Sequence, residues 1–104
     1  MEKYKCVDGT VVLVTKRLKY MPTAQSGVII DEHHAIHLIS YTTPVVTIDP
    51  MGWLTCNGTF SATTRKHISA FMKEYAPKFG YYTCKDAYEN KYTINIYTGE
   101  IVSL

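Results

Sequence analysis

The histidines at positions 33, 34 and 37 come closest, by type and spacing, to a metal site. On a strand His33 and His37 would share one face, and on a helix they would lie one turn apart, so either would bring two imidazoles together. Spacing specifies no third ligand, although Asp31, Glu32 or a distant cysteine would serve. The alternative is a polar turn that enters a strand with His37 half-buried. We favour that turn and predict neither a metal site nor a cofactor, because structural zinc sites normally show four ligands in recognisable pairs.

A cysteine hydrolase is the second chemistry that the residue types allow, with Cys56 or Cys84 as the nucleophile and His67 as its base. Nothing in the sequence brings these residues together, and the glycine pattern of a nucleophile elbow is absent. The third cysteine is Cys6 and no CxxC pair exists, so the alternative is three reduced thiols, each partly buried in the core. Scattered acidic residues and isolated glycines disfavour paired-carboxylate sites and phosphate loops. We predict that the protein is not an enzyme.

A polar site is suggested by the run from Thr63 to His67. Thr63 and Thr64 offer hydroxyl groups, and Arg65, Lys66 and His67 add positive charge where the dipole of a helix start would favour an acidic residue. Such a conflict is what a binding site for a phosphate or a carboxylate would show. The alternative is that Arg65 and Lys66 only solvate the exposed face of a helix.

A second basic group precedes it, where Lys16, Arg17 and Lys19 are followed by Tyr20. Interleaved basic and aromatic residues can follow a nucleic-acid backbone and stack on its bases. The alternative, which we prefer, is an edge strand whose charges discourage pairing with another chain. The candidate anion- or nucleic-acid-binding residues are therefore Thr63, Thr64, Arg65, Lys66, His67, Lys16, Arg17 and Lys19.

Tyrosine is unusually frequent, with 9 of the 104 residues. Its side chain combines a large apolar area with a polar tip, which suits both half-buried strands and binding surfaces. The C-terminal third is the richest part, and we predict a protein-binding surface there, formed by Tyr81, Tyr82, Tyr88, Tyr92 and Tyr97.

A helix over about residues 63–76 must position the polar run from Thr63 to His67. Its apolar residues follow the i, i+3, i+4, i+7 spacing of one helical face, at Ile68, Phe71, Met72 and Tyr75. Thr63 or Thr64 is expected to cap its start, and Pro77 and Gly80 to end it.

The rest of the chain is expected to form short strands over residues 3–7, 10–20, 28–30, 35–41, 45–48, 53–56, 92–97 and 100–104. Residues 21–27 should be a loop, and Pro44 should separate two strands. Residues 85–90 should form a single helical turn capped by Thr83. Hairpin turns are predicted at Asp8-Gly9, Asn57-Gly58 and Thr98-Gly99, and a further turn at Asp49–Gly52. The result is an α+β fold in which one main helix packs on a small, twisted antiparallel sheet of about five to seven strands, as a single domain over residues 1–104.

The predicted core comprises Val12, Val14, Ile29, Ile36, Leu38, Val46, Ile48, Trp53, Leu54, Phe60, Ile68, Phe71, Met72, Ile94, Ile96 and Ile101. Hydrophobic residues make up 46% of the chain, which excludes a disordered tail, and no apolar run is long enough to span a bilayer. The first residues lack the apolar segment of a signal peptide, so we expect a cytoplasmic protein without membrane contact. A net charge of +2 is well below the clustered excess of a dedicated nucleic-acid binder.

The middle of the chain, about residues 35–75, resembles a family of short domains of unknown function from bacteria and their phages. The similarity rests on Ser40-Tyr-Thr-Thr-Pro-Val-Val46, Trp53-Leu54 and Phe60-Ser-Ala-Thr-Thr-Arg-Lys-His-Ile68 followed by Phe71. In that family an SYxTPV strand, a hairpin and an SxTTxxHI helix start recur in this order. The resemblance implies no activity; it marks Ser61, Thr63, Thr64, His67 and Ile68 as motif positions, where the threonines would cap the helix and His67 would bond back to the preceding hairpin.

Two functions follow as expectations. The first is a non-catalytic accessory protein of a phage or mobile element that binds another protein; inhibition of a host defence or regulatory protein is one form that the resemblance suggests. The second is a small nucleic-acid-binding domain that uses Arg65, Lys66 and the Lys16, Arg17, Lys19 strand. Exposed edge strands would also permit a homodimer.

Overall fold

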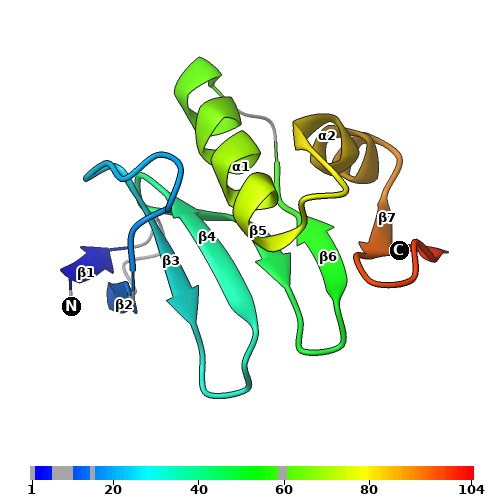
Figure 1. Ribbon diagram of the computed structural model, residues 1–104, viewed down its shortest axis with the longest axis horizontal. Coiled ribbons are helices and arrows are strands. Elements are labelled where there is room, and N and C mark those ends of the chain that lie inside the picture. The colour runs from blue at the N-terminus through cyan, green and yellow to red at the C-terminus, as the bar shows by residue number, and fades with distance from the viewer. Residues whose placement is uncertain (1, 6–10, 15, 59–60) are drawn as a thin grey trace.

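The computed structural model describes residues 2–5, 11–14, 16–58 and 61–104. Its main sheet has six strands in chain order, each antiparallel to its neighbours, and two helices lie in the chain between the fourth and fifth of them (Figure 1). The elements are β1 (Glu2–Lys5), β2 (Val11–Val14), β3 (Ser26–Ile30), β4 (Ile36–Ser40), β5 (Thr43–Ile48), β6 (Trp53–Cys56), α1 (Ala62–Tyr75), α2 (Tyr81–Glu89), β7 (Tyr92–Asn95) and β8 (Ile101–Ser103). The predicted α+β fold is confirmed, with two helices in place of one main helix.

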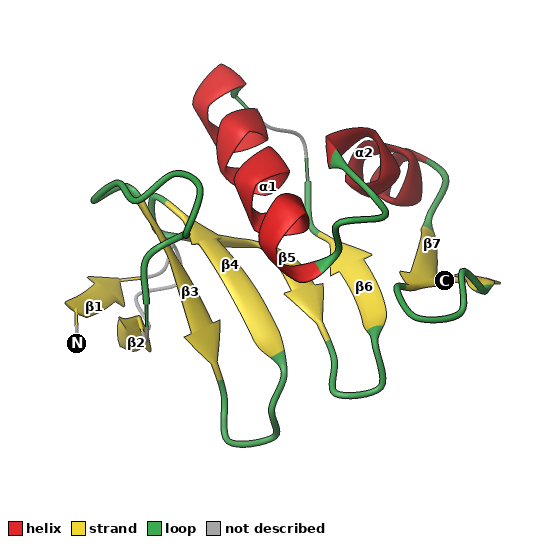
Figure 2. Ribbon diagram, in the orientation of Figure 1, coloured by secondary structure: helices red, strands yellow, loops and turns green. Residues whose placement is uncertain are grey.

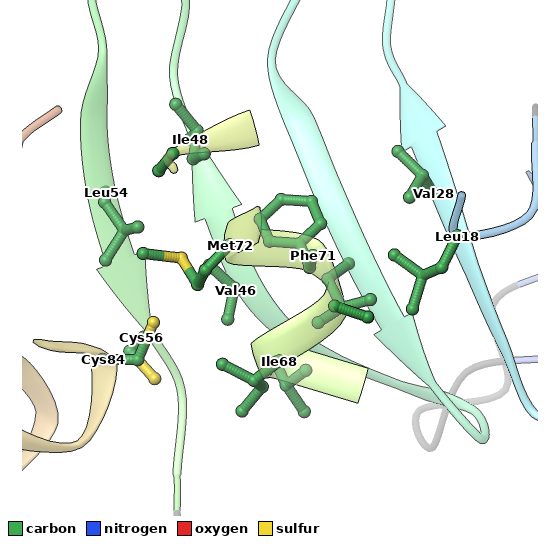
Figure 3. Packing of buried hydrophobic residues seen from close by; sticks show 14 of the residues in the cluster. Leu18, Val28, Val46, Ile48, Leu54, Cys56, Ile68, Phe71, Met72 and Cys84 are labelled. Atoms are coloured by element: carbon green, nitrogen blue, oxygen red, sulfur yellow. The ribbon is translucent and has the colours of Figure 1, made fainter. Parts of the chain in front are cut away.

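Both helices pack on the same side of the sheet, α1 over its centre and α2 beside β6 and β7 (Figure 2). Antiparallel register places apolar side chains of neighbouring strands opposite each other on that face, in the rows Val28, Leu38, Val46 and Cys56, and Ile36, Ile48, Leu54 and Ile94. Against these rows α1 places Ile68, Phe71 and Met72 (Figure 3). Because side chains alternate along a strand, His37, Thr47 and Thr55 form a row on the opposite face.

The main helix agrees with the prediction apart from a one-residue shift, since α1 covers Ala62–Tyr75 instead of 63–76. Ile68, Phe71 and Met72 are fully buried, which confirms the apolar face read from their spacing. The chain leaves the helix at Ala76, immediately before Pro77, because proline cannot continue the backbone ladder. Neither helix of the described chain is long and apolar enough to cross a membrane.

The second helix corrects the prediction of a connection at residues 80–83 and a single turn at 85–90 capped by Thr83. The structure has a nine-residue helix, Tyr81–Glu89, whose N-cap is Gly80. Cys84 and Ala87 are buried three residues apart, and Tyr81 precedes them at the same spacing. This helical period was present in the sequence, but two of its members are small residues, which give a weak hydrophobic signal.

Two strands begin earlier than predicted. Ser26 and Gly27, assigned to a loop, are the first residues of β3, and both are buried. Pro44 lies inside β5 rather than before it, opposite Ile39, where the register with β4 shifts. Proline is tolerated there because the ladder is interrupted at a bulge.

The segment 10–20 is a regular strand only over Val11–Val14 among its described residues. It pairs antiparallel with β1, and Lys16 then forms an isolated bridge to Val28 of β3. Beyond Lys16 the chain is irregular and places Leu18 in the core, fully buried. The predicted Asp8-Gly9 turn lies outside the described residues.

Two of the predicted turns are confirmed. Asp49–Gly52 joins β5 to β6, with Gly52 at a φ of 95° and the Asp49 carboxylate accepting two backbone N–H groups. Thr98-Gly99 joins β7 to β8, with Gly99 at a φ of 77°. The prediction of a hairpin at Asn57-Gly58 is wrong, because β6 pairs with β5 and β7 and the chain continues from it to α1.

Of the thirteen predicted core residues whose side chains are described, eight are buried, namely Leu38, Val46, Ile48, Leu54, Ile68, Phe71, Met72 and Ile94. Ile29, Ile36, Trp53 and Ile96 are half-buried. The prediction that Ile101 lies in the core is wrong. Its side chain is 56% exposed, because α2 packs on β6 and β7 and not on the edge strand β8. Leu18 was missed, and Val12, Val14 and Phe60 lie outside the residues whose side chains are described.

Candidate functional site

The start of α1 is capped by Ser61, whose hydroxyl accepts a hydrogen bond from the backbone N–H of Thr64 at 3.2 Å. The prediction that Thr63 or Thr64 provides the cap is therefore wrong. A capping residue needs an extended backbone, which Ser61 has, whereas both threonines already lie within the helix. The cap satisfies one of the first-turn N–H groups that an anion would otherwise bind.

Thr64 and His67 face the interior and form a buried cluster with Ser40 at the end of β4. The Ser40 hydroxyl lies 3.0 Å from Oγ1 of Thr64 and 2.8 Å from Nδ1 of His67. Burial lowers the pKa of His67 from its ordinary value, because the charged imidazolium loses water. The family motif suggested that His67 bonds back to the hairpin that precedes the helix; in the structure it bonds Ser40 at the end of β4 instead, and this bond ties α1 to the sheet.

A serine beside a neutral histidine is the arrangement of an activated nucleophile, which also needs access to a substrate. Ser40 and His67 are both buried, and Nε2 of His67 has no hydrogen-bond partner within the described chain. The ring of Tyr41 lies against the imidazole, with the ring centres 5.9 Å apart. Among the described residues the pair is therefore a buried link between α1 and β4.

Arg65 and Lys66 face the other way, into a groove of about 660 Å³ that we call the α1 groove. Three segments form it: the irregular chain before β3, the outer face of α1, and the first residues of α2. Its lining residues are Tyr20, Met21, Ala62, Arg65, Lys66, Ser69, Ala70, Lys73, Tyr81 and Tyr82. None of them is acidic.

Three cations lie on two of the aromatic rings of the α1 groove. Nζ of Lys73 is 4.4 Å from the centre of the Tyr20 ring, and Nζ of Lys19 is 5.4 Å from the same centre. The guanidinium carbon of Arg65 lies 4.8 Å from the centre of the Tyr81 ring. These distances are those of cation–π contacts, so the rings help to hold positive charge along the groove.

Lys16, which the sequence grouped with Lys19, is used in another way. Its ammonium forms an ion pair with the carboxylate of Glu74, which also accepts the backbone N–H of Lys19 at 2.8 Å. The hydrogen bond to Glu74 is the main cause that raises the pKa of Lys16. Burial alone would raise the pKa of Glu74, but these two donors lower it below its ordinary value. Arg17 donates to the backbone carbonyl of Ser26 at 3.4 Å, and Lys19 lies on the ring of Tyr20, which lines the α1 groove.

The five tyrosines of the predicted protein interface are spread over three hollows and the end of β7. Tyr81 and Tyr82 line the α1 groove, and Tyr82, which is 71% exposed, also lines a second hollow beside α2. Tyr92 lines this second hollow too, where its hydroxyl donates to Asp86 at 2.5 Å, a bond that raises the pKa of Tyr92 to about 12. Tyr88 lines a third hollow, and Tyr97 lies exposed after β7.

The histidines considered as metal ligands lie around the β3–β4 turn. His33 and His34 are exposed, while the ring nitrogens of His37 lie 2.8 Å from the Asp31 carboxylate and 3.1 Å from the Thr47 hydroxyl. The His37 bond lowers the pKa of Asp31 below its ordinary value. Within the described ranges, no group of three His, Cys, Asp or Glu side chains is placed to hold a metal ion.

The cysteine hydrolase considered from the sequence has no counterpart in the described residues. Cys56 and Cys84 are buried, unbonded thiols that contact each other, whereas His67 bonds Ser40. Sequence reasoning missed this contact, because it joins the end of β6 to the middle of an unrecognised helix.

The fold and the groove together define a small α+β domain with a basic, tyrosine-lined groove on one helix. Residues 14–93 match the family described as "Family of unknown function (DUF8033)", and the chain belongs to that family. The match includes the segment 35–75 in which a family of unknown function was identified by resemblance. No curated protein and no solved structure matches the chain.

Proposed function

We propose that this protein is a non-catalytic binding protein that holds single-stranded nucleic acid in the α1 groove. The observation that carries the proposal is the lining of the groove, which combines Arg65, Lys66 and Lys73 with three tyrosines and contains no carboxylate. Proteins that bind single strands join a positive groove, which follows the phosphates, to aromatic rings on which bases stack. Lys19 at the edge of the groove adds a fourth positive charge.

Single-stranded nucleic acid fits this lining better than a duplex does. A tyrosine ring stacks on the face of a base, and the faces are hidden between neighbouring pairs in a duplex. Tyr82, at 71% exposure, is the ring most open to such stacking. An acidic protein segment is the competing occupant, because it would satisfy the cations but leave the rings without bases.

The experiment is fluorescence anisotropy with a labelled oligothymidylate of about 12 nucleotides, a length typical of single-strand sites. The same titration is run with a duplex of equal length and with a poly-glutamate peptide. We expect the oligothymidylate to bind most tightly. Tighter binding of the peptide would replace the proposal by docking on an acidic protein, and equal binding of the duplex would show a charge effect without base stacking.

Variants separate the two contributions. Tyr82→Ala removes a stacking ring and should weaken oligothymidylate binding by about fivefold to a hundredfold, the effect of one base–aromatic contact, while poly-glutamate binding stays unchanged. Lys78→Ala is the matched control, since Lys78 is an exposed lysine that does not line the groove. If Tyr82→Ala leaves oligothymidylate affinity unaltered, the stacking role is wrong.

The setting of this function rests on the resemblance given above. It supports an accessory protein of a phage or mobile element, and the unbonded thiols of Cys56 and Cys84 support a reducing compartment such as the cytoplasm. A tagged protein recovered from host lysate with and without nuclease tests this. Loss of the captured material after nuclease agrees with the proposal, whereas one nuclease-resistant protein partner would favour inhibition of a host defence or regulatory protein instead.

A further inference from the structure

Cys56 and Cys84 form a thiol pair that the proposed function does not use. Cys56 is the last residue of β6, and Cys84 lies in the middle of α2, which packs against that strand. Both belong to the same buried cluster, and Figure 3 shows the two side chains next to each other where β6 meets α2. Tertiary packing alone brings them together.

The two thiols differ in their access to solvent. Cys56 is 8% exposed and lines a hollow of about 340 Å³ between β6 and the end of α2. Cys84 is fully buried behind it and does not line that hollow. A reagent that enters the hollow therefore meets Cys56 first.

The neighbouring thiols also shift each other's acidity. The contact lowers the pKa of Cys56 although burial opposes this, and the contact together with burial raises the pKa of Cys84. A thiol that lines a hollow, with a second thiol buried against it, is the arrangement found in dithiols that exchange with disulfides.

We infer that Cys56 and Cys84 are a redox-active dithiol that reacts with low-molecular-weight disulfides such as oxidised glutathione, with Cys56 attacking and Cys84 resolving. In the first step the Cys56 thiolate attacks one sulfur of the glutathione disulfide. The S–S bond of glutathione breaks, a mixed disulfide forms on Cys56, and one glutathione leaves as a thiolate that takes up a proton.

In the second step Cys84 attacks the Cys56 sulfur. Formation of the mixed disulfide removes the negative charge of the Cys56 thiolate, which had opposed ionisation of Cys84. Cys84 gives up its proton, its sulfur bonds to the Cys56 sulfur, and the second glutathione leaves as a thiolate that takes up a proton. Two electrons pass from the protein to one glutathione disulfide, which yields two glutathione thiols and a bond that joins α2 to β6.

The test uses the full chain carrying Cys6→Ser, because Cys6 lies outside the described residues and would add a third thiol. The protein is equilibrated with mixtures of reduced and oxidised glutathione, alkylated, and examined by mass spectrometry. We expect both thiols to disappear together, with loss of two hydrogen atoms and a peptide link between Cys56 and Cys84.

Two variants in the same background assign the roles. Cys84→Ala should accumulate one glutathione on Cys56, because the resolving thiol is gone. Cys56→Ala should leave Cys84 unmodified in the folded protein and modified in urea, because Cys84 is reached only through Cys56. Circular dichroism establishes that each variant is folded.

Two results would overturn the inference. The first is a pair that stays reduced in the folded Cys6→Ser protein under mixtures that oxidise the same chain in urea. The second is glutathione on Cys84 in folded Cys56→Ala protein. The first result needs no substitution at the pair, so it remains decisive even where a core variant fails to fold.

Discussion

Removal of Lys66 should reduce the salt dependence of nucleic-acid binding by a defined amount. Three cations line the α1 groove, namely Arg65, Lys66 and Lys73. Each phosphate neutralised on a single strand contributes a slope of about −0.7 to a plot of log K against log salt, so contacts by the three lining cations give about −2.1 and contacts by two give about −1.4. Between about 50 and 200 mM salt the affinity should therefore fall about 18-fold for the natural protein and about 7-fold for Lys66→Ala.

The assay is the oligothymidylate titration, repeated at five salt concentrations for each protein. Alanine is a good helix former, so the substitution at an exposed position of α1 leaves the fold intact. Lys78→Ala, outside the groove, should keep the slope of the natural protein. The reasoning is refuted if the natural protein shows a slope near zero, or if Lys66→Ala and Lys78→Ala change the slope equally.

Three further predictions concern stability, each measured by urea unfolding. The pKa of His67 is lowered in the folded protein, so below pH 6.5, the ordinary pKa of histidine, the unfolded chain binds more protons than the folded one. The free energy of unfolding should therefore fall by up to about 1.4 kcal/mol per pH unit as the pH drops below 6.5. His67→Gln should flatten this fall between pH ~7 and ~5. Ser61→Ala removes the N-cap of α1 and should lower the free energy of unfolding by about 0.5–2 kcal/mol, whereas Ser69→Ala, on the exposed side of the same helix, should not. Gly52→Ala should lower it by about 1–3 kcal/mol, because Gly52 has a φ of 95° and a Cβ there would lie 2.5 Å from Cδ2 of Tyr97; no loss would mean that the turn readily adopts another conformation.

The parts of the fold that the sequence predicted correctly are those with strong local signals. The spacing of Ile68, Phe71 and Met72 can be satisfied by one helical face, so α1 was identified to within a residue. The turns at Asp49–Gly52 and Thr98-Gly99 were found because they need residues that favour a turn backbone. Each of these signals acts between residues a few positions apart.

The second helix was missed because its local signal is weak. Its buried residues, Cys84 and Ala87, are small, and Gly80 gives no side-chain cap. What stabilises α2 is packing against β6 and β7, which are neighbours in the sheet although both helices separate them in the chain. A stretch of sequence that ends before β7 therefore carries no signal for this packing.

The candidate site also combines features that the sequence predicts with features that only the tertiary structure shows. Composition and spacing by themselves marked Arg65 and Lys66 as a positive helix start and marked the tyrosine-rich C-terminal third. Only the tertiary structure decided that Thr64 and His67 turn inward to Ser40, while Arg65 and Lys66 face outward. Neighbours on a helix point in directions about 100° apart, so one polar run serves the core and the surface at once.

The tertiary structure also decided which distant residues meet. Tyr20 reaches Lys73, and Cys56 reaches Cys84, across elements that no sequence pattern pairs. The physical reason is that periodicity fixes which face of an element is buried, whereas the neighbour of that face depends on how all elements pack against one core. The sequence alone therefore determined the kinds of residue available for binding, and packing determined that they form a groove and a thiol pair.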